Sequence, residues 1–274
     1  MARRTTWRAL ALLPALALTA AGCAQSIAPV SGDGELQFVE AGKLTTCTHM
    51  PYPPFQFDED GEHVGFDVEL VDLVARDLQL EQKLFDTPFE GIQSGEALNT
   101  RKCDVAAAAM TITDTREQNM DFSEPYFDAK QALLVNAKTP YQDLPELRGK
   151  KLGVQLGTTG EEYAKQHEAE HGYEVVQFED VALMANAVQT GKVDAAINDN
   201  GVVLDFAKKN PDTKVTAEYA TGEAYGIGIQ KGNAQLVQKV NDSLRKARES
   251  GEYDRIYQKW FGKAPEQSGE TPGQ

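Results

Sequence analysis

The sequence predicts an α/β protein of two lobes, and three observations lead to this expectation. Strand-like apolar stretches alternate with helical patterns, an order typical of largely parallel sheets covered by helices. About 250 residues follow an N-terminal signal, enough for one large or two smaller domains. The segments "RKCDVAAAAMT" (101–111) and "TGKVDAAINDN" (190–200) share a basic turn, an aspartate, a small apolar strand and a polar end. This similarity indicates two units of similar plan.

Apolar residues recur at helical spacing in four parts of the chain. These are Val71–Leu78, Ala182–Thr190, Leu236–Leu244 and Tyr253–Trp260. Gly191 follows the second segment at the position where a glycine commonly ends a helix. The sequence therefore predicts helices at these four places, with strands between them.

The N-terminus has the composition of a secretory signal. Three arginines precede an apolar run, Ala9–Leu18, which is shorter than the roughly 20 residues of a membrane-spanning helix. Cys23 follows Ala21-Gly22 and resembles the cysteine of a bacterial lipobox, which is lipidated and becomes the mature N-terminus. An ordinary signal peptide cut nearby is the alternative, because Ala20 stands where leucine is favoured. We expect residues 1–22 to be removed and Cys23 to carry a lipid anchor.

The charge of the chain excludes one class of function. Without the three arginines of the signal, 24 of the 27 basic residues remain against 42 acidic ones, a net charge of −18. Nucleic-acid binding needs clustered Lys and Arg, so no nucleic-acid partner is expected. A strongly acidic exported chain favours a soluble monomer.

Four stretches are expected to meet at a ligand site. In α/β sheets, ligands bind beyond the carboxyl ends of the strands. Four predicted strands end at polar or aromatic residues, namely in 49–55, 109–116, 155–160 and 198–199. The chain is expected to cross between the lobes near 131–136 and again near 220–228, which makes a two-strand hinge.

These crossings divide the chain into segments. Residues 36–132 and 224–262 are expected to form lobe 1, and 133–223 lobe 2. The stretches 23–35 and 263–274 are rich in Ser, Gly, Pro, Glu and Gln, which predicts a flexible tether and a disordered tail.

Arg116 and Asp199 are the two charged candidates for the site. Thr113 or Asp114 can cap a helix whose first turn holds Arg116, and a guanidinium suits a carboxylate ligand. The alternative is a surface ion pair of Arg116 with Glu117 or Asp121. Asp199 ends a strand and can receive an ammonium group, although a loop aspartate can equally form a turn. Spacing alone does not decide between these roles.

Cys47 and Cys103 remain as a pair if Cys23 is lipidated. An exported protein favours a disulfide between them. Against it, Cys103 lies several residues too early in its strand to face Cys47, and two buried free thiols are the alternative. The sequence carries no nucleophile motif, P-loop or zinc-protease motif, so no catalytic residue, metal or cofactor is expected.

The order of the motifs resembles a known family. The segments "YPPFQFDEDGEHVGFDVELVDLVARDL", "DVAAAAMTITDTREQNMDFSEPYF", "LRGKKLGVQLGTTGEEYA", "GKVDAAINDN" and "SGEYDRIYQKWFG" occur in the expected order. Together they resemble the polar amino-acid-binding proteins of ABC importers, family 3 of the bacterial extracellular solute-binding proteins. The resemblance covers 43–262. It implies the type II periplasmic-binding-protein fold, with two α/β lobes, a two-strand hinge and a ligand cleft between them.

The resemblance also implies roles for single residues. Arg116 corresponds to the arginine that binds the ligand α-carboxylate, assisted by Thr111, Ala109 and, from the second lobe, Thr159. Asp199 corresponds to the aspartate that takes the α-ammonium. Tyr52 and Phe89 correspond to the aromatic residues on either side of the ligand, and His49 and Gln155 to positions that contact its side chain. His49 replaces a frequent acid or amide, for which Glu90 or Asp58 could compensate.

The implied function is capture of a polar amino acid outside the cytoplasm and its delivery to the transmembrane subunits of an ABC permease. The protein would be held at the membrane by its lipid. The same fold also occurs in cyclohexadienyl-dehydratase-type enzymes, in which acids of the cleft transfer protons. Glu223 and Asp199 would be those acids here, but the intact pair Arg116 and Asp199 favours a binding protein over an enzyme.

Overall fold

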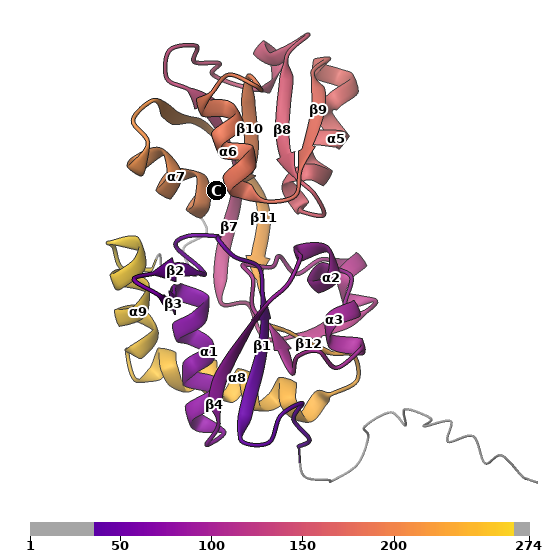
Figure 1. Ribbon diagram of the computed structural model, residues 1–274, viewed down its shortest axis with the longest axis vertical. Coiled ribbons are helices and arrows are strands. Elements are labelled where there is room, and N and C mark those ends of the chain that lie inside the picture. Colours follow the sequence, from indigo (N-terminus) through magenta and orange to yellow (C-terminus); the bar gives the residue numbers. More distant parts are fainter. Residues whose placement is uncertain (1–35, 266–274) are drawn as a thin grey trace, which may run out of the picture. The chain divides into compact units, whose positions relative to one another are not determined.

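Each lobe is built on a five-stranded sheet with helices packed against it (Figure 1). The computed structural model describes residues 36–265, which belong to one unit, Ser31–Gln274. Several predicted segments lie outside the described residues. These are the signal peptide (1–22), Cys23 with the rest of the tether (23–35), and residues 266–274 of the predicted tail.

The sheet of lobe 1 has the strand order β4-β1-β5-β12-β6. The bounds of these strands are Glu81–Asp86, Lys43–Thr48, Val105–Ala106, Gly228–Gln230 and Met120–Phe122. β4 and β5 run parallel to β1, whereas β12 is antiparallel to both β5 and β6. Residues 44–48 of β1 are buried, as expected of a strand covered on both faces.

Six helices and a hairpin complete lobe 1. The helices are α1 (Phe66–Asp77), α2 (Phe89–Gln93), α3 (Glu96–Asn99), α4 (Asp114–Glu117), α8 (Ala234–Glu249) and α9 (Glu252–Phe261). The hairpin joins β2 (Phe57–Glu59) to β3 (Glu62–Val64). α1, α8 and α9 contain three of the four predicted helical segments, so these predictions are confirmed. Each of the three buries its apolar residues.

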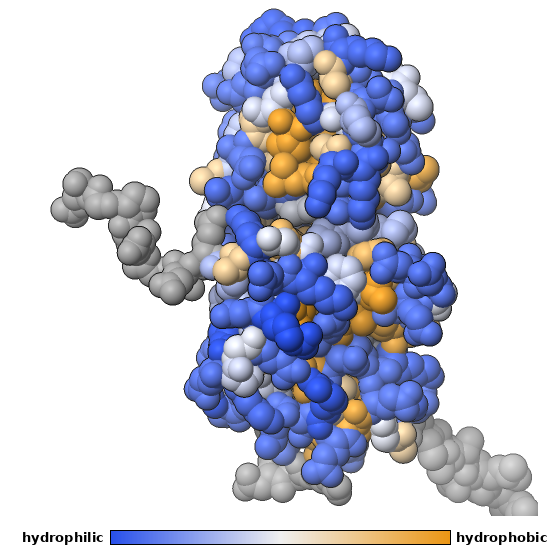
Figure 2. Space-filling view, turned by 90° about the vertical axis from the view of Figure 1, so that its left-hand side faces the viewer, coloured by the Kyte–Doolittle hydropathy of each residue, from blue (hydrophilic) through white to orange (hydrophobic). Residues whose placement is uncertain are grey.

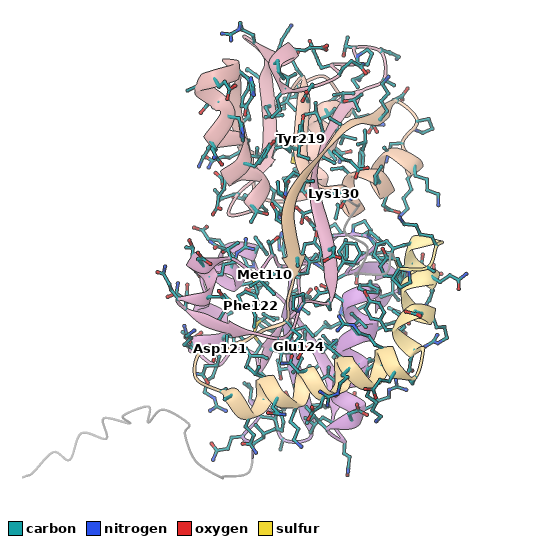
Figure 3. All side chains as sticks on the ribbon, turned by 180° about the vertical axis from the view of Figure 1, so that it is seen from behind. Met110, Asp121, Phe122, Glu124, Lys130 and Tyr219 are labelled. Atoms are coloured by element: carbon teal, nitrogen blue, oxygen red, sulfur yellow. A yellow bond between two sulfur atoms is a disulfide. The ribbon has the colours of Figure 1, made fainter. Side chains whose placement is uncertain are left out.

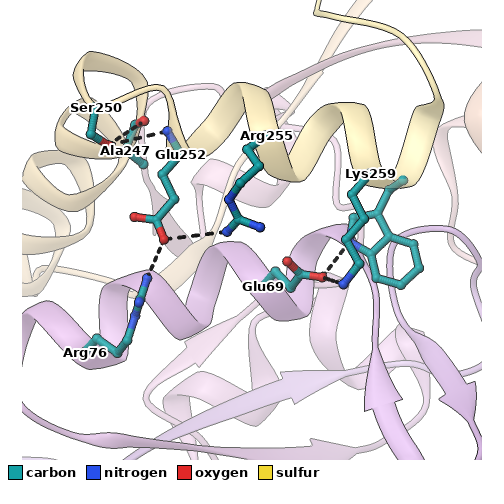
Figure 4. A network of polar contacts seen from close by, with 8 residues as sticks. Glu69, Arg76, Ala247, Ser250, Glu252, Arg255 and Lys259 are labelled. Atoms are coloured by element: carbon teal, nitrogen blue, oxygen red, sulfur yellow. Dashed lines mark hydrogen bonds and ion pairs between the residues drawn. The ribbon is translucent and has the colours of Figure 1, made fainter.

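The C-terminal helix α9 is fastened to α1 by packing and by polar contacts (Figure 4). Tyr253 packs edge-on against Phe66, with ring centroids 5.8 Å apart. Glu252 accepts a hydrogen bond from Arg76 at 2.9 Å, and Glu69 accepts one from Trp260 Nε1 at 2.9 Å. Exposed ion pairs contribute little to stability, so the buried apolar residues hold this helix in place.

The sheet of lobe 2 has the strand order β11-β7-β10-β8-β9. These strands span Thr213–Tyr225, Phe127–Asn136, Ala195–Asp199, Lys151–Gln155 and Glu174–Phe178. They pack with α5 (Thr159–His171), α6 (Val181–Gln189), α7 (Asn200–Lys209) and a 3₁₀ helix, Leu144–Leu147. α6 confirms the fourth predicted helix, and Gly191 beyond it has a φ of 74°.

The two similar sequence segments occupy equivalent places. β5, from the first segment, is the central strand of its sheet, and β10, from the second, is the central strand of the other. Both sheets nevertheless mix parallel and antiparallel pairs, since β12 in lobe 1 and β7 and β11 in lobe 2 run antiparallel to their neighbours. The expectation of largely parallel sheets was therefore only partly right, because the strands that cross or return between the lobes reverse direction.

Strands β7 and β11 carry the chain between the lobes (Figure 3). Residues 127–129 of β7 pair with 223–225 of β11, and further along Gln131 pairs with Tyr219. The pairing is interrupted between Tyr219 and Glu223. Residues 131–135 of β7 already pair with β10. The residues of the predicted crossing near 131–136 thus also belong to the sheet of lobe 2, where the apolar run after Gln131 is buried.

Cys47 and Cys103 form a disulfide, with their Cα atoms 5.5 Å apart. Both residues are buried among apolar side chains of lobe 1, which include Phe89, Ile92 and Leu98. The objection from strand register does not hold, because Cys103 lies in the turn before β5 and not within the strand. The bridge links β1 to the segment between α3 and β5.

The face of the molecule drawn in Figure 2 is mostly hydrophilic, with apolar residues exposed over limited areas of both lobes. This agrees with the excess of acidic residues in the sequence. Between residues 36 and 265, no helix has the length and apolar character needed to cross a membrane.

Candidate functional site between the lobes

A pocket lies between the lobes, and all four predicted stretches contribute to it. The space that no atom fills, including its open mouth, is about 310 Å³. The lining residues are His49, Tyr52, Gln56, Phe89, Ala108, Ala109, Thr111, Arg116, Gln155, Thr158, Thr159 and Asp199. Every ligand-binding candidate from the sequence is among them.

Arg116 is buried in this pocket and makes no surface ion pair. Its side chain leaves α4, a helix of one turn that Thr113 caps by accepting a hydrogen bond from the Arg116 N–H. The guanidinium donates to the carbonyl oxygen of Thr111 at 2.7 Å and to that of Gly157, in lobe 2, at 3.0 Å. Asp121, the proposed surface partner, instead pairs with Lys231 at 2.8 Å. The surface-pair alternative is therefore wrong.

Burial lowers the pKa of Arg116 from its usual value, and the nearby Asp199 carboxylate opposes this shift. The guanidinium also lies over the ring of Phe89, with 5.4 Å between its central carbon and the ring centroid. A buried cation whose contacts are carbonyl oxygens and an aromatic face retains a strong preference for an anionic partner. Arg116 is thus suited to bind a carboxylate.

Asp199 is the opposite charge of the pocket, on lobe 2. It occupies the position before α7, yet its side chain does not cap that helix. Its carboxylate accepts hydrogen bonds from Gln131 Nε2 at 2.6 Å, from Tyr52 Oη at 3.3 Å and from the Tyr225 hydroxyl. Burial, followed by the neighbouring Glu223, raises the pKa of Asp199 to about 6. The turn-forming role considered for Asp199 is not the one that its side chain plays.

Tyr52 connects the two lobes across the pocket. Its hydroxyl donates to Asn198 Oδ1, in β10, at 2.7 Å. Phe55, three residues along, packs against Gly201 of lobe 2, where an added Cβ would come within 3.0 Å of the ring. Together with the bond from Arg116 to Gly157, these contacts hold the lobes against each other around the pocket.

The backbone at Ala109 has an unusual conformation that a buried acid supports. Ala109 has a φ of 48°, in the left-handed region that residues other than glycine seldom adopt. Its N–H donates to Asp67 Oδ2 at 2.7 Å, and Tyr126 Oη donates to the other oxygen of Asp67 at 2.9 Å. Burial raises the pKa of Asp67 to about 7, although both hydrogen bonds oppose this shift. Asp67 thereby fixes the pocket wall.

Glu223 lies beside the pocket, where β11 resumes pairing with β7. Its Oε2 accepts hydrogen bonds from Thr159 Oγ1 and Gln131 Nε2, both at 2.9 Å, and lies 3.4 Å from Thr111 Oγ1. Thr111 belongs to lobe 1 and Thr159 to lobe 2. One carboxylate therefore joins the two lobes near the hinge.

Apart from Arg116 and Asp199, the residues that line the pocket include no Asp, Glu, Lys or Arg. His49, Gln56 and Gln155 line it, whereas Glu90 and Asp58 do not. Asp58 is exposed and contacts His63. The pocket lining therefore gives no support to the suggestion that Glu90 or Asp58 supplies a charge missing at His49.

Sequence reasoning missed several residues of the site. Gln56 and Ala108 each lie next to a predicted stretch and could have been included by extending it, whereas Thr158 lies within the stretch 155–160 but was not singled out. Gln131 and Tyr225 contact Asp199 from the crossing strands, and a polar residue at the start of the apolar run "QALLV" was the available signal for Gln131. The described residues contain no group of three or more His, Cys, Asp or Glu that could hold a metal ion.

This arrangement places a buried cation on one lobe and a buried carboxylate on the other, with aromatic and neutral polar walls between them. The fold and the pocket define a protein of the type II periplasmic-binding class, in which two α/β lobes enclose a small solute. The chain belongs to the bacterial extracellular solute-binding proteins, family 3, whose model matches residues 44–263. This match confirms the resemblance in the sequence.

The names of two similar proteins agree with membership of this family. The chain is 33% identical over 269 residues to a probable histidine-binding protein of Neisseria gonorrhoeae, covering 94% of this chain and 96% of that one. It is 34% identical over 242 residues to the L-cystine-binding protein TcyJ of Escherichia coli, strain K12, covering 86% and 90%.

A solved structure confirms the fold. An ancestral arginine-binding protein bound to arginine superposes with a TM-score of 0.77 at 40% identity, covering 81% of this chain and 99% of that one. The described lobes thus have the two-lobed fold that the sequence predicted.

Proposed function

We propose that this protein captures a polar amino acid outside the cytoplasm by closure of its lobes and delivers it to an ABC permease. One observation carries the proposal most strongly. Arg116 and Asp199, from different lobes, are both buried in the same pocket and carry opposite charges. These charges match the carboxylate and the ammonium of an amino acid.

Binding an amino acid in this way would also drive closure. A zwitterion that enters a closed pocket loses water around both charges, at several kcal/mol each. Charge-assisted hydrogen bonds recover about 1.5–3 kcal/mol apiece, so each end needs several partners. Arg116, Thr111 and Ala109 would supply them from lobe 1, and Asp199 and Thr159 from lobe 2. A ligand that contacts both lobes stabilises the closed state over the open one.

The walls of the pocket fit the rest of an amino acid. Tyr52 and Phe89 would lie on either side of its aliphatic part, and His49 and Gln155 would contact its side chain. The names of the relatives, which refer to histidine, cystine, arginine and glutamine, support an amino acid with a polar side chain.

We also propose that the protein is a monomeric lipoprotein anchored through Cys23. The support is the sequence of the N-terminus, with its short apolar run and small residues before the cysteine. Family members act outside the cytoplasm, and an anchored binding protein stays close to the transmembrane subunits of its importer. Mass spectrometry of the membrane fraction would detect a diacylglyceryl group on Cys23, which Cys23→Ser would abolish.

The enzymatic alternative has one observation in its favour. An ancestral amino-acid-binding protein described as a precursor of cyclohexadienyl dehydratase superposes with a TM-score of 0.73 at 34% identity. Asp199 and Glu223 supply two carboxylates close to the cleft. The intact pair Arg116 and Asp199 supports binding instead. Turnover of prephenate or arogenate by the purified protein would reverse this assignment.

The proposed function is tested by a thermal-shift screen of the twenty amino acids, followed by calorimetry on those that bind. A ligand that binds only the folded state raises the melting temperature, by an amount that grows with its concentration over Kd. We expect a polar amino acid to raise it in the wild type and to have little effect on Arg116→Ala. The absence of a shift with all twenty would contradict the proposal.

A further inference from the structure

The pocket also presents hydrogen-bond acceptors that no group of the protein uses. Three residues that line the pocket have a buried side-chain atom without a hydrogen-bond partner: His49 Nε2, Gln56 Oε1 and Gln155 Oε1. Buried polar groups in folded proteins are almost always paired, so unpaired ones need an explanation. A ligand that supplies N–H donors would satisfy them.

The hydrogen bonds of His49 fix its ring as an acceptor. His49 Nδ1 lies 3.2 Å from the carbonyl oxygen of Thr87, which can only accept. Nδ1 therefore carries the proton of this bond, and in the neutral imidazole Nε2 is then a bare acceptor. No other side chain in the described structure donates to Nε2.

The amide of Gln56 is oriented in the same way. Its Nε2 donates to the backbone carbonyl oxygen of His49 at 3.3 Å, so the amide nitrogen is the atom on that side. Oε1 is then left as the unpaired acceptor. His49 and Gln56 thus form one linked pair on lobe 1, with both free positions of the same chemical type.

Gln155 adds an acceptor from lobe 2. It ends β8, is 1% exposed, and its Oε1 has no hydrogen-bond partner. The three unpaired acceptors of the pocket therefore come from both lobes. A single side chain that donates to all three would contribute to closure.

The charges around the pocket favour a ligand with a net positive charge. Arg116 contributes one positive charge, whereas Asp199 and Glu223 contribute two negative ones, and the two carboxylates share Gln131 as a donor. A zwitterion with a neutral side chain leaves this excess unchanged. A cationic side chain cancels it, and an acidic side chain adds to it. The net charge of −15 of the whole chain acts in the same direction at long range.

We propose that His49, Gln56 and Gln155 select an amino acid whose side chain is a cation with several N–H donors and no acceptor, as in the guanidinium of arginine. The inference rests on the proposed function, because it assigns the side-chain end of the same pocket. It differs from recognition by a carboxylate, since these three groups are neutral acceptors. The countercharge comes from Asp199 and Glu223.

This arrangement discriminates between ligands of similar shape. Citrulline has the length and planar end of arginine but carries an oxygen in place of one nitrogen, and it is neutral. Its oxygen would face an acceptor, and a site that leaves buried polar groups unpaired rejects such an analogue strongly. Glutamine presents the same conflict, and glutamate adds a negative charge.

Calorimetry of the wild-type protein with arginine, citrulline, glutamine and glutamate tests the proposal. We expect arginine to bind at least tenfold more tightly than each of the others. Citrulline, glutamine or glutamate binding as tightly as arginine would overturn the inference and leave the proposed function intact. If none of the twenty amino acids binds, the proposed function fails and this inference fails with it.

A variant separates the side-chain end from the rest of the pocket. Gln155→Leu should weaken arginine at least fivefold and leave norvaline, which lacks side-chain donors, unchanged. Gln142→Leu, at an exposed glutamine outside the pocket, is the matched control and should change neither. Equal losses for arginine and norvaline would indicate general damage to the pocket and contradict the role of Gln155. The ligand series with the wild type decides the matter if Gln155→Leu does not fold.

Discussion

The guanidinium of Arg116 donates a hydrogen bond to the carbonyl oxygen of Gly157, 3.0 Å away on the other lobe. The residue proposed to bind the ligand carboxylate therefore also contacts the opposite wall directly. Its second bond, to Thr111, stays within lobe 1. Opening of the lobes would break the first bond and leave the second, so Arg116 would remain positioned to meet an incoming carboxylate.

Arg116→Ala should weaken binding of the amino acid at least tenfold. Each charge-assisted hydrogen bond that it removes contributes about 1.5–3 kcal/mol, and tenfold corresponds to about 1.4 kcal/mol. Calorimetry measures the affinity, and circular dichroism checks that the variant is folded. Lys231→Ala, at a partly exposed cation paired with Asp121, is the control and should bind normally. An unchanged affinity of Arg116→Ala would exclude the carboxylate role.

Asp199→Asn should affect the ammonium end selectively. The substitution keeps the shape of the side chain and removes the negative charge that would face the α-ammonium. We expect binding of the amino acid to fall by tenfold or more and binding of its des-amino analogue to change little. Competition calorimetry with both ligands provides the comparison. If both lose affinity equally, Asp199 does not contact the ammonium.

Binding should weaken as the pH falls below about 6. Asp199 has its pKa raised to about 6 by burial and by Glu223, while Tyr225, Gln131 and Arg116 oppose the shift. Below this pH the free protein holds a proton on Asp199 that must leave before an ammonium can bind. Calorimetry in two buffers of different ionisation enthalpy should detect the released proton near pH 5.5. Asp199→Asn should release none.

The same pKa has a consequence for stability. The folded state retains a proton on Asp199 that the unfolded chain, with a pKa near 3.8, has already lost. Its contribution to the free energy of unfolding is therefore present below about pH 4 and is lost as the pH rises through about 6. Urea unfolding can be measured for the wild type and for Asp199→Asn between about pH 4 and pH 6. The free energy of unfolding of the wild type should fall relative to that of the variant as the pH rises through this range.

Tyr52→Phe should loosen the closed state without unfolding the protein. The change removes the hydrogen bond from Tyr52 to Asn198, which joins the lobes at 2.7 Å. One net hydrogen bond contributes about 0.5–1.5 kcal/mol, so affinity should fall about two- to tenfold, mainly through faster dissociation. Stopped-flow measurement of ligand release tests this. An unchanged dissociation rate would show that this bond does not contribute to closure.

Replacing both bridged cysteines should destabilise lobe 1. The disulfide closes a loop between residues 56 positions apart, and a bridge of this kind contributes typically 2–4 kcal/mol by restricting the unfolded chain. The double variant Cys47→Ala, Cys103→Ala should unfold at lower urea concentration and still bind its ligand, because neither cysteine lines the pocket. A midpoint equal to that of the wild type would show that the bridge adds no stability.

The helices and the pocket-forming stretches could be predicted from local sequence. Helical spacing located α1, α6, α8 and α9, since an amphipathic stripe is a property of one segment. The rule that ligands bind beyond the carboxyl ends of strands predicted that the stretches with Tyr52, Arg116 and Asp199 would meet at one site. Both signals depend on neighbours in the chain and need no knowledge of distant contacts.

Features that depend on distant partners could not be predicted in this way. The register of Gln131 against Asp199 and the approach of Cys103 to Cys47 are set by tertiary packing. The same holds for Glu90 and Asp58, whose distance from the pocket depends on how lobe 1 folds. Spacing left Arg116 undecided between a surface pair and the site, and its burial, which spacing does not show, excludes the surface pair.

The antiparallel pair of β7 and β11 has a mechanical consequence. Because the two crossing strands are hydrogen-bonded to each other on both sides of the interruption between Tyr219 and Glu223, they form one ribbon and cannot bend independently. The proposed closure of the lobes would then be a single rotation centred on that interruption. A ligand that contacts either lobe would act on this same rotation, and Glu223, where pairing resumes, would take part in it.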